Sequence, residues 1–208
     1  MTVPRFRLTM LALTPLIAAG LVWSAPAAAQ FSQSYKFLEA VKKREGTEVT
    51  DMLAEPGTTI VNTRDVTTGE TALHLVTARR DLTWMQFLVA KGANVNLKDV
   101  KGVTPLVLAC NLGFTEGAEF LVGKGARVDE SNSSGETPLI TSVHNRNVAL
   151  VRVLLKAGAN PDRADNSGRT ARDYAALDKG GTLLAEIESA MKARAAAQTL
   201  KPNYGPKL

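Results

Sequence analysis

An internal repeat of 33 residues is the feature that most constrains the fold of this chain. Four glycines recur at this interval, each followed two residues later by a threonine: Gly69, Gly102, Gly135 and Gly168. A second series of Gly-Ala pairs keeps the same period, and a leucine stands four residues before each of them: Leu88, Leu121 and Leu154. Two series in phase indicate units of supersecondary structure that bury their apolar faces by stacking on their neighbours.

Residues 102 to 134 contain the signals of two helices and a loop. Thr104 can cap a helix with its hydroxyl, and Pro105 suits the first helical position, where its missing N–H costs nothing. We therefore predict one helix from Pro105 to near Gly113 and a second over residues 115 to 123. The polar remainder of the unit predicts an extended, hairpin-like loop.

Neither helix is long enough to be stable alone, because isolated helices shorter than about 12 to 15 residues are marginal in water. The units must stack, which would align equivalent apolar residues into columns running through the core. Two such columns are expected from the repeat: Leu73, Leu106 and Leu139, and Phe87, Phe120 and Val153.

The repeat resembles the ankyrin repeat. The resemblance rests on GETALHLVTA, GVTPLVLACNLG, GETPLIT and GRTARDYA, and on LLKAGANPDRADNSG at 154 to 168, and it covers residues 62 to 190. It implies an all-α solenoid of stacked helix pairs joined by hairpin-like loops, with a concave face that binds other proteins. It also implies that His74 makes local hydrogen bonds between repeats.

Both ends of the array depart from the pattern. Residues 30 to 61 fit loosely and are predicted to form an N-terminal capping repeat, with a helix around residues 35 to 41 and another at 49 to 53. At the other end, a longer helix from Leu183 to about Ala196 has a polar outer side, as a C-terminal cap requires. Residues 191 to 208 would then hold the end of this helix and a basic tail, expected to be disordered.

The first 29 residues have the three parts of a secretory signal peptide: two arginines, a largely apolar run and a stretch of small residues. Cleavage is expected after Ala29, with Ala27 as the alternative. The composition is typical of a bacterial signal peptide and predicts a periplasmic or secreted protein with no stable membrane association after cleavage. The competing interpretation is an uncleaved anchor, which would make the chain a membrane-tethered ankyrin adaptor.

The charge distribution argues against a nucleic-acid partner. The whole chain has 25 Lys and Arg residues against 20 Asp and Glu residues. Two of the bases lie in the predicted signal peptide and four in residues 191 to 208, so residues 30 to 190 carry 19 bases against 20 acids. Nucleic-acid-binding domains instead cluster their bases on one face.

The sequence contains no recognisable catalytic or metal-binding motif. The lone cysteine, Cys110, lies in an apolar run and is expected to be a buried hydrophobic residue. Only two histidines are present, and CxxC, GxSxG and P-loop elements are absent. We therefore predict a monomer that is not an enzyme, requires no cofactor or metal, and binds an unidentified protein.

The resemblance to ankyrin repeats places candidate binding residues in the loop before each repeated threonine and at the end of each first helix. These candidates are Arg79, Val100, Lys101, Val103, Asn111, Leu112, Glu136, His144 and Asn145. Val100, Val103 and Leu112 are expected to expose an apolar cluster, with Arg79, Lys101 and His144 around it. The alternative is that these are scattered surface residues with no common partner.

Overall fold

The structure is a computed structural model that describes residues 27–199. Within this range the chain forms ten α-helices and a short 3₁₀ helix. The α-helices are α1 (Ala27–Lys43), α2 (Gly46–Ala54), α3 (Ala72–Ala78), α4 (Leu82–Ala90), α5 (Pro105–Asn111), α6 (Thr115–Gly123), α7 (Pro138–His144), α8 (Val148–Lys156), α9 (Ala171–Ala176) and α10 (Thr182–Thr199), and the 3₁₀ helix is η1 (Ile60–Asn62).

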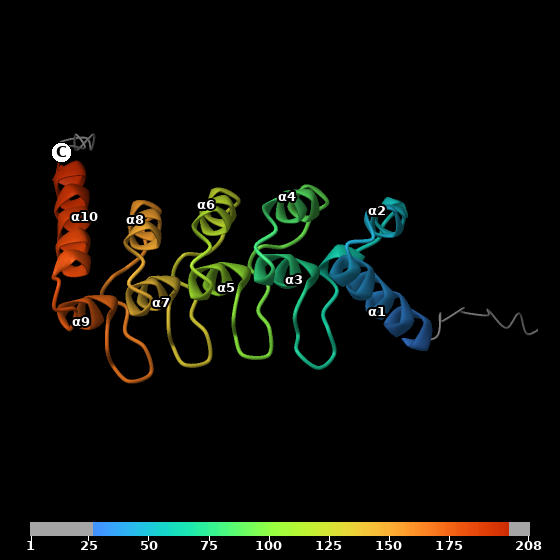
Figure 1. Ribbon diagram of the computed structural model, residues 1–208, viewed down its shortest axis with the longest axis horizontal. Helices are drawn as coiled ribbons and strands as arrows, with labels where there is room; N and C mark the ends of the chain where they lie inside the picture. Colours follow the sequence, from blue (N-terminus) through green and yellow to red (C-terminus); the bar gives the residue numbers. More distant parts are fainter. Residues whose placement is uncertain (1–26, 200–208) are drawn as a thin grey trace, which may run out of the picture.

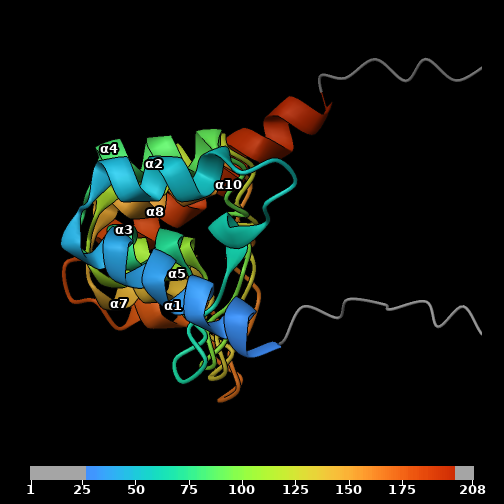
Figure 2. The same ribbon diagram turned by 90° about the vertical axis from the view of Figure 1, so that its right-hand side faces the viewer.

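The helices form two parallel layers along an elongated stack (Figure 1). The first helices of the units, α1, α3, α5, α7 and α9, make one layer, and α2, α4, α6, α8 and α10 make the other. Long loops project from the first layer, and the view along the stack shows them superposed on one side (Figure 2). The predicted solenoid of stacked helix pairs joined by loops is confirmed.

The helices of the central unit begin and end where the sequence predicts. The Thr104 hydroxyl accepts a hydrogen bond from the Val107 amide at 3.3 Å, and Pro105 is the first helical residue of α5. The helix α5 ends at Asn111, and Gly113 then takes the left-handed conformation with a φ of 64°. In the flanking units Arg80 and Arg146 take this position with φ angles of 56° and 50°.

The core runs through the stack as columns of equivalent residues. Leu73, Leu106 and Leu139 are at most 1% exposed, and Ile187 continues the column of Leu121 and Leu154 into the last unit. The second predicted column is wrong as a core column, because its members are only half-buried: Phe87, Phe120 and Val153. They lie at the edge of the core, where lysine ammonium groups stand over the two phenylalanine rings at 5.9 and 5.8 Å.

In the first three loops, the repeated glycine before the threonine is required by the close approach of the next loop. Gly69 and Gly102 have φ angles of 70° and 74°, which side chains with a Cβ rarely adopt. A Cβ on Gly69 would also lie 2.9 Å from the Val100 amide nitrogen of the next loop, and one on Gly102 would lie 3.0 Å from that of Ser133. The motif therefore encodes both the turn and the stacking of the loops.

The caps are longer than the sequence predicts. The helix α1 starts at Ala27, so it includes the last residues of the predicted signal peptide, whose cleavage stays a prediction. Most of that segment, and residues 200–208 of the predicted tail, lie outside the described residues. Within residues 27–199 no helix combines the length and apolar character needed to cross a membrane.

Leu121→Ala or Leu154→Ala should lower the free energy of unfolding by about 2 to 5 kcal/mol. Both leucines are fully buried between neighbouring units, so truncation leaves a cavity. Denaturant titration measures the loss, and Glu119→Ala on the exposed side of α6 is the control, expected to stay within about 0.5 kcal/mol. Losses under about 1 kcal/mol for both leucine variants would contradict the stacked core.

Arg146→Gly should be neutral or stabilising. Holding a non-glycine residue at this positive φ costs on the order of 1 kcal/mol. The ion pair that would be lost, from Arg146 to Asp178 at 3.6 Å, involves an arginine side chain that is 75% exposed and so contributes little. Arg146→Ala is the matched control, because it loses the same pair and keeps the strain, and it should melt below the glycine variant. A glycine variant that melts lower than the alanine variant would refute this account of the helix end.

Candidate functional site

The loops and the ends of the first helices form one continuous surface, here called the inner face. It comprises residues 64–70, 97–103, 130–136 and 163–169 of the loops and residues 78–79, 111–112, 144–145 and 177–178 at the helix ends. Backbone hydrogen bonds join successive loops: Val100 N–H to the Thr68 carbonyl at 3.0 Å, and Ser133 N–H to the Lys101 carbonyl at 2.9 Å. The loops are thus held in a row by their main chains.

An Asp or Asn side chain fixes the turn inside each loop. Asp99 Oδ1 accepts hydrogen bonds from the Lys101 and Val103 amides, both at 2.8 Å. Asn132 and Asp165 repeat this arrangement in the next two loops. The turn of the second loop is thus held by Asp99 and the backbone, which leaves the side chains of Val100 and Lys101 at its tip available for contacts with other molecules.

His74 connects the first two repeats of the array, as the resemblance implies. The Thr71 amide donates to Nδ1 at 3.2 Å, which places the imidazole proton on Nε2, and Nε2 then donates to the Val103 carbonyl at 3.0 Å. Burial lowers the pKa of His74 from its ordinary value of 6.5, because desolvation disfavours the charged ring. His74 is a structural residue of the stack.

Several predicted binding residues are open to solvent on the inner face. Val100 is 65% exposed at the tip of its loop, beside the exposed Lys101. Asn111 and His144 are exposed at the ends of α5 and α7, and Glu136 is half-buried at the base of the third loop. These positions supply one apolar side chain and both charge signs.

The predicted apolar cluster of Val100, Val103 and Leu112 is not formed. Val103 and Leu112 are half-buried, not exposed, and they flank the opposite ends of the seven-residue helix α5. Leu112 packs against the hydrophobic core, and the carbonyl of Val103 is engaged by His74. Of the three residues, only Val100 presents a largely free apolar side chain.

Arg79 and Asn145 perform structural tasks between repeats. Arg79 donates to the Val41 carbonyl at 2.5 Å, pairs with Asp81 at 3.3 Å and lies over the Trp84 ring at 5.2 Å. The Asn145 amide donates to the carbonyls of Cys110 and Asn111 at 3.1 and 3.2 Å, which closes the end of the preceding helix. The hydrogen bonds of both side chains are therefore made largely to other residues of the stack.

Two exposed apolar residues of the inner face were not predicted. Val66 is 78% exposed in the first loop, which has one more residue between its aspartate and glycine than the next loop. Leu177 is 68% exposed and falls 33 residues after His144, at the position that Asn111 takes in the second repeat. The period would have identified Leu177, whereas the extra loop residue hides Val66 from an alignment of repeats.

His144 at the end of α7 lies between Glu136 of the third loop and Tyr174 of α9. Its Nδ1 lies 3.4 Å from Glu136 Oε1, and its ring meets Tyr174 edge to face with the centroids 4.2 Å apart. The Tyr174 hydroxyl donates to Asp165 Oδ2 at 2.7 Å. This bond and one from Ser167 hold the pKa of Asp165 well below its usual range. The network presents an oriented aromatic and polar surface on the last two repeats.

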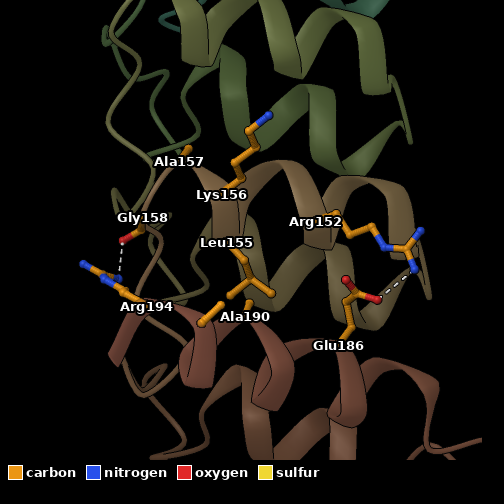
Figure 3. Close-up of a pocket in the computed structure, with 9 residues that line it drawn as sticks. Arg152, Leu155, Lys156, Ala157, Gly158, Glu186, Ala190 and Arg194 are labelled. Carbon is orange, nitrogen blue, oxygen red and sulfur yellow. Dashed lines mark hydrogen bonds and ion pairs between the residues drawn. The ribbon is translucent and has the colours of Figure 1, made fainter. Parts of the chain in front are cut away.

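A groove on the outer layer, between α8 and α10, is lined by basic side chains together with apolar and small residues (Figure 3). Leu155 and Ala190 face one another across it. Arg152 pairs with Glu186 at 2.8 Å, and Arg194 donates to the Gly158 carbonyl at 3.3 Å. The arginines join the C-terminal cap to the preceding repeat, so we assign this groove to packing within the stack.

Comparison with family models bears on the identity of the repeat. One model described as ankyrin repeats, three copies, matches residues 37–132, and a second, described as ankyrin repeats, many copies, matches residues 121–175. The chain belongs to the ankyrin repeat family. A comparison with curated proteins found no match.

Family membership assigns a general class of function. Ankyrin repeats are generally protein-interaction modules without enzymatic activity, so this chain is expected to bind protein partners. In the described residues no group of three or more His, Cys, Asp or Glu could hold a metal ion. Cys110 is fully buried, and burial raises the pKa of its thiol to about 12, which makes it a poor nucleophile.

The stability of the protein should fall as the pH is lowered through the titration range of His74. The pKa of His74 is lower in the folded chain than in the unfolded chain, so the unfolded state binds the proton more readily below about pH 6.5. The stabilisation is present above this pH and is lost as the pH decreases toward the folded value.

Denaturant titrations at about pH 7.5 and about pH 5.5 measure this loss. His74→Gln is the informative variant, because glutamine three residues after a capping threonine preserves a capping box and does not titrate. The variant should lose less unfolding free energy between the two pH values than the parent protein does. An equal loss in both proteins would assign the pH dependence to other groups.

Proposed function

We propose that this chain is an exported ankyrin scaffold that binds a protein partner through its inner face. The proposal rests mainly on the exposure of Val66 and Val100, which stand on neighbouring loops whose turns are held by an aspartate side chain and by the backbone. Interfaces concentrate binding energy in a few such residues, which lose solvent on binding and are ringed by polar groups.

The surroundings of the two valines fit this role. Lys101 lies beside Val100, and Thr67, Thr68 and Glu70 follow Val66 in its loop. Exposed residues of the first-helix ends, Asn111, His144 and Leu177, continue the same face along the stack. A partner lying across several repeats would contact apolar side chains at the loop tips and at Leu177, with polar groups between them.

Export is the second part of the proposal, and it is supported by the three-part pattern of residues 1 to 29. Mass spectrometry of the mature protein decides this point. An N-terminus at residue 30 or 28 supports export with cleavage, and an intact segment supports the membrane-tethered alternative.

Changing Val66 and Val100 together to serine should weaken partner capture at least tenfold, or about 1.4 kcal/mol, with folding preserved. Affinity capture from the exported fraction with the parent protein identifies the partner, and titration with each variant then gives its affinity. The matched control changes Glu116 and Glu119, exposed on the outer helix α6, to serine. Unchanged affinity for a variant whose circular dichroism melt is normal would move the site away from these loops.

A further inference from the structure

An open groove on the outer layer separates the capping helix α2 from α4. Its walls are formed by Thr47, Thr50 and Asp51 of α2 and by Thr83, Trp84 and Phe87 of α4. The helix α2 belongs to the N-terminal cap, which departs from the repeat pattern. Side chains of α4 therefore border an open groove on this side, because their neighbour is not a regular repeat. This groove plays no part in the inner face.

The two aromatic rings of the groove are held in fixed orientations. Trp84 and Phe87 meet edge to face with centroids 5.8 Å apart, and the Arg79 guanidinium stands 5.2 Å from the Trp84 ring. Arg79 is itself fixed by its bonds to the Val41 carbonyl and Asp81. Rigid, partly buried aromatic side chains are the typical anchors of binding surfaces, because little conformational entropy remains to be lost.

Asp51 of α2 lines this groove and carries negative charge. Glu48 of α2 and Glu55, directly after α2, stand three residues before and four residues after it; all three acids are exposed and take part in no ion pair with the described residues. A hydrogen bond with the neighbouring Glu45 carboxyl raises the pKa of Glu48, as expected where carboxylates crowd together. On the α4 side Lys91 is engaged over the Phe87 ring at 5.9 Å. The groove therefore fits an apolar segment that carries positive charge.

Residues 200 to 208 of this chain, LKPNYGPKL, have this chemistry. They contain two lysines, a tyrosine and two prolines, and no acidic residue. Proline-containing segments are common ligands of aromatic-lined grooves, since proline limits the entropy lost on binding. We propose that the groove between α2 and α4 binds residues 200–208 of a second copy of the chain.

The dimensions of the stack require a second copy. Tyr204 lies five residues beyond the end of α10 and can reach at most about 17 Å from it. The outer helices α10, α8, α6 and α4 follow one another along the stack (Figure 1), and three helix spacings amount to about 24 to 30 Å. The segment cannot place Tyr204 beside Trp84 of its own chain, so the contact joins the C-terminal end of one copy to the N-terminal end of the next.

Such an interface is heterologous and can extend into open chains. The proposal departs from the expectation of a monomer.

Sedimentation velocity of the full chain over the micromolar to millimolar range tests the association. The average mass should rise with concentration, and added salt should weaken the rise because the contact is charge-assisted. Glu48→Lys with Asp51→Lys, and separately Lys201→Glu with Lys207→Glu, should each weaken self-association at least tenfold. Mixing the two variants should restore association between them.

Glu116→Lys with Glu119→Lys on α6 is the matched control, since it makes the same charge change on a neighbouring outer helix and should leave association unchanged. A mass that stays at one chain throughout the concentration range would overturn the proposal. Association that the control variant weakens equally would assign it to net charge. Failure of the two charge-reversed variants to associate when mixed would also refute the pairing.

A synthetic peptide of residues 200–208 provides an independent measurement. It should change the tryptophan fluorescence of the full chain, dissociate its assemblies, and have no effect on emission in a Trp84→Phe variant, which retains Trp23. A control peptide with both lysines changed to glutamate and tyrosine to serine should be at least tenfold weaker. Equal effects of the two peptides, or none from either, would contradict binding in this groove. Because these tests use no other protein, their outcome is separate from that of the inner-face proposal.

Discussion

Stacking between neighbouring units is the interaction on which the rest of this structure depends. The first helices of the central repeats have seven residues and the second helices nine, which is below the length at which a helix is stable alone in water. Their stability comes from columns such as Leu73, Leu106 and Leu139, each member of which is buried by the units on both sides. The backbone bonds between successive loops depend on the same alignment. A change in one unit therefore acts on its neighbours before it affects the more distant repeats.

Much of the fold could be predicted because the constraints that fix it are local and repeated. Thr104 and Pro105 define the start of α5 by capping and by a fixed φ, and Gly113 defines its end by a positive φ. Each signal involves only a few adjacent residues, so the sequence carries it directly. The period then places the same elements in every unit, and the helix bounds of the central repeats agree with the prediction. Arg80 and Arg146 also follow this rule, because the backbone at the helix end keeps its conformation when glycine is absent.

The candidate site was less predictable, because exposure depends on contacts that do not repeat. Arg79 appears free in the repeat pattern, but the N-terminal cap brings the Val41 carbonyl to its guanidinium. Asn145 contacts carbonyls of the preceding unit, and Leu112 packs against the core although its counterpart in the third repeat is a polar residue. Val66 was missed because its loop has one additional residue, which shifts it out of register with the other loops. These differences arise between units and cannot be deduced from one unit alone.

This division between repeated and unrepeated contacts indicates how the scaffold separates stability from recognition. In the second loop Asp99 and the backbone hold the turn, while Gly102 allows the next loop to approach, so the side chains at the tip carry no part of that task. Val100 and Lys101 can therefore change with little effect on the turn. On the outer layer the irregular N-terminal cap leaves Trp84 and Phe87 beside an open groove. Binding surfaces in this chain are thus expected at two kinds of place: loop tips whose side chains take no part in holding the turn, and places where the repeat is interrupted.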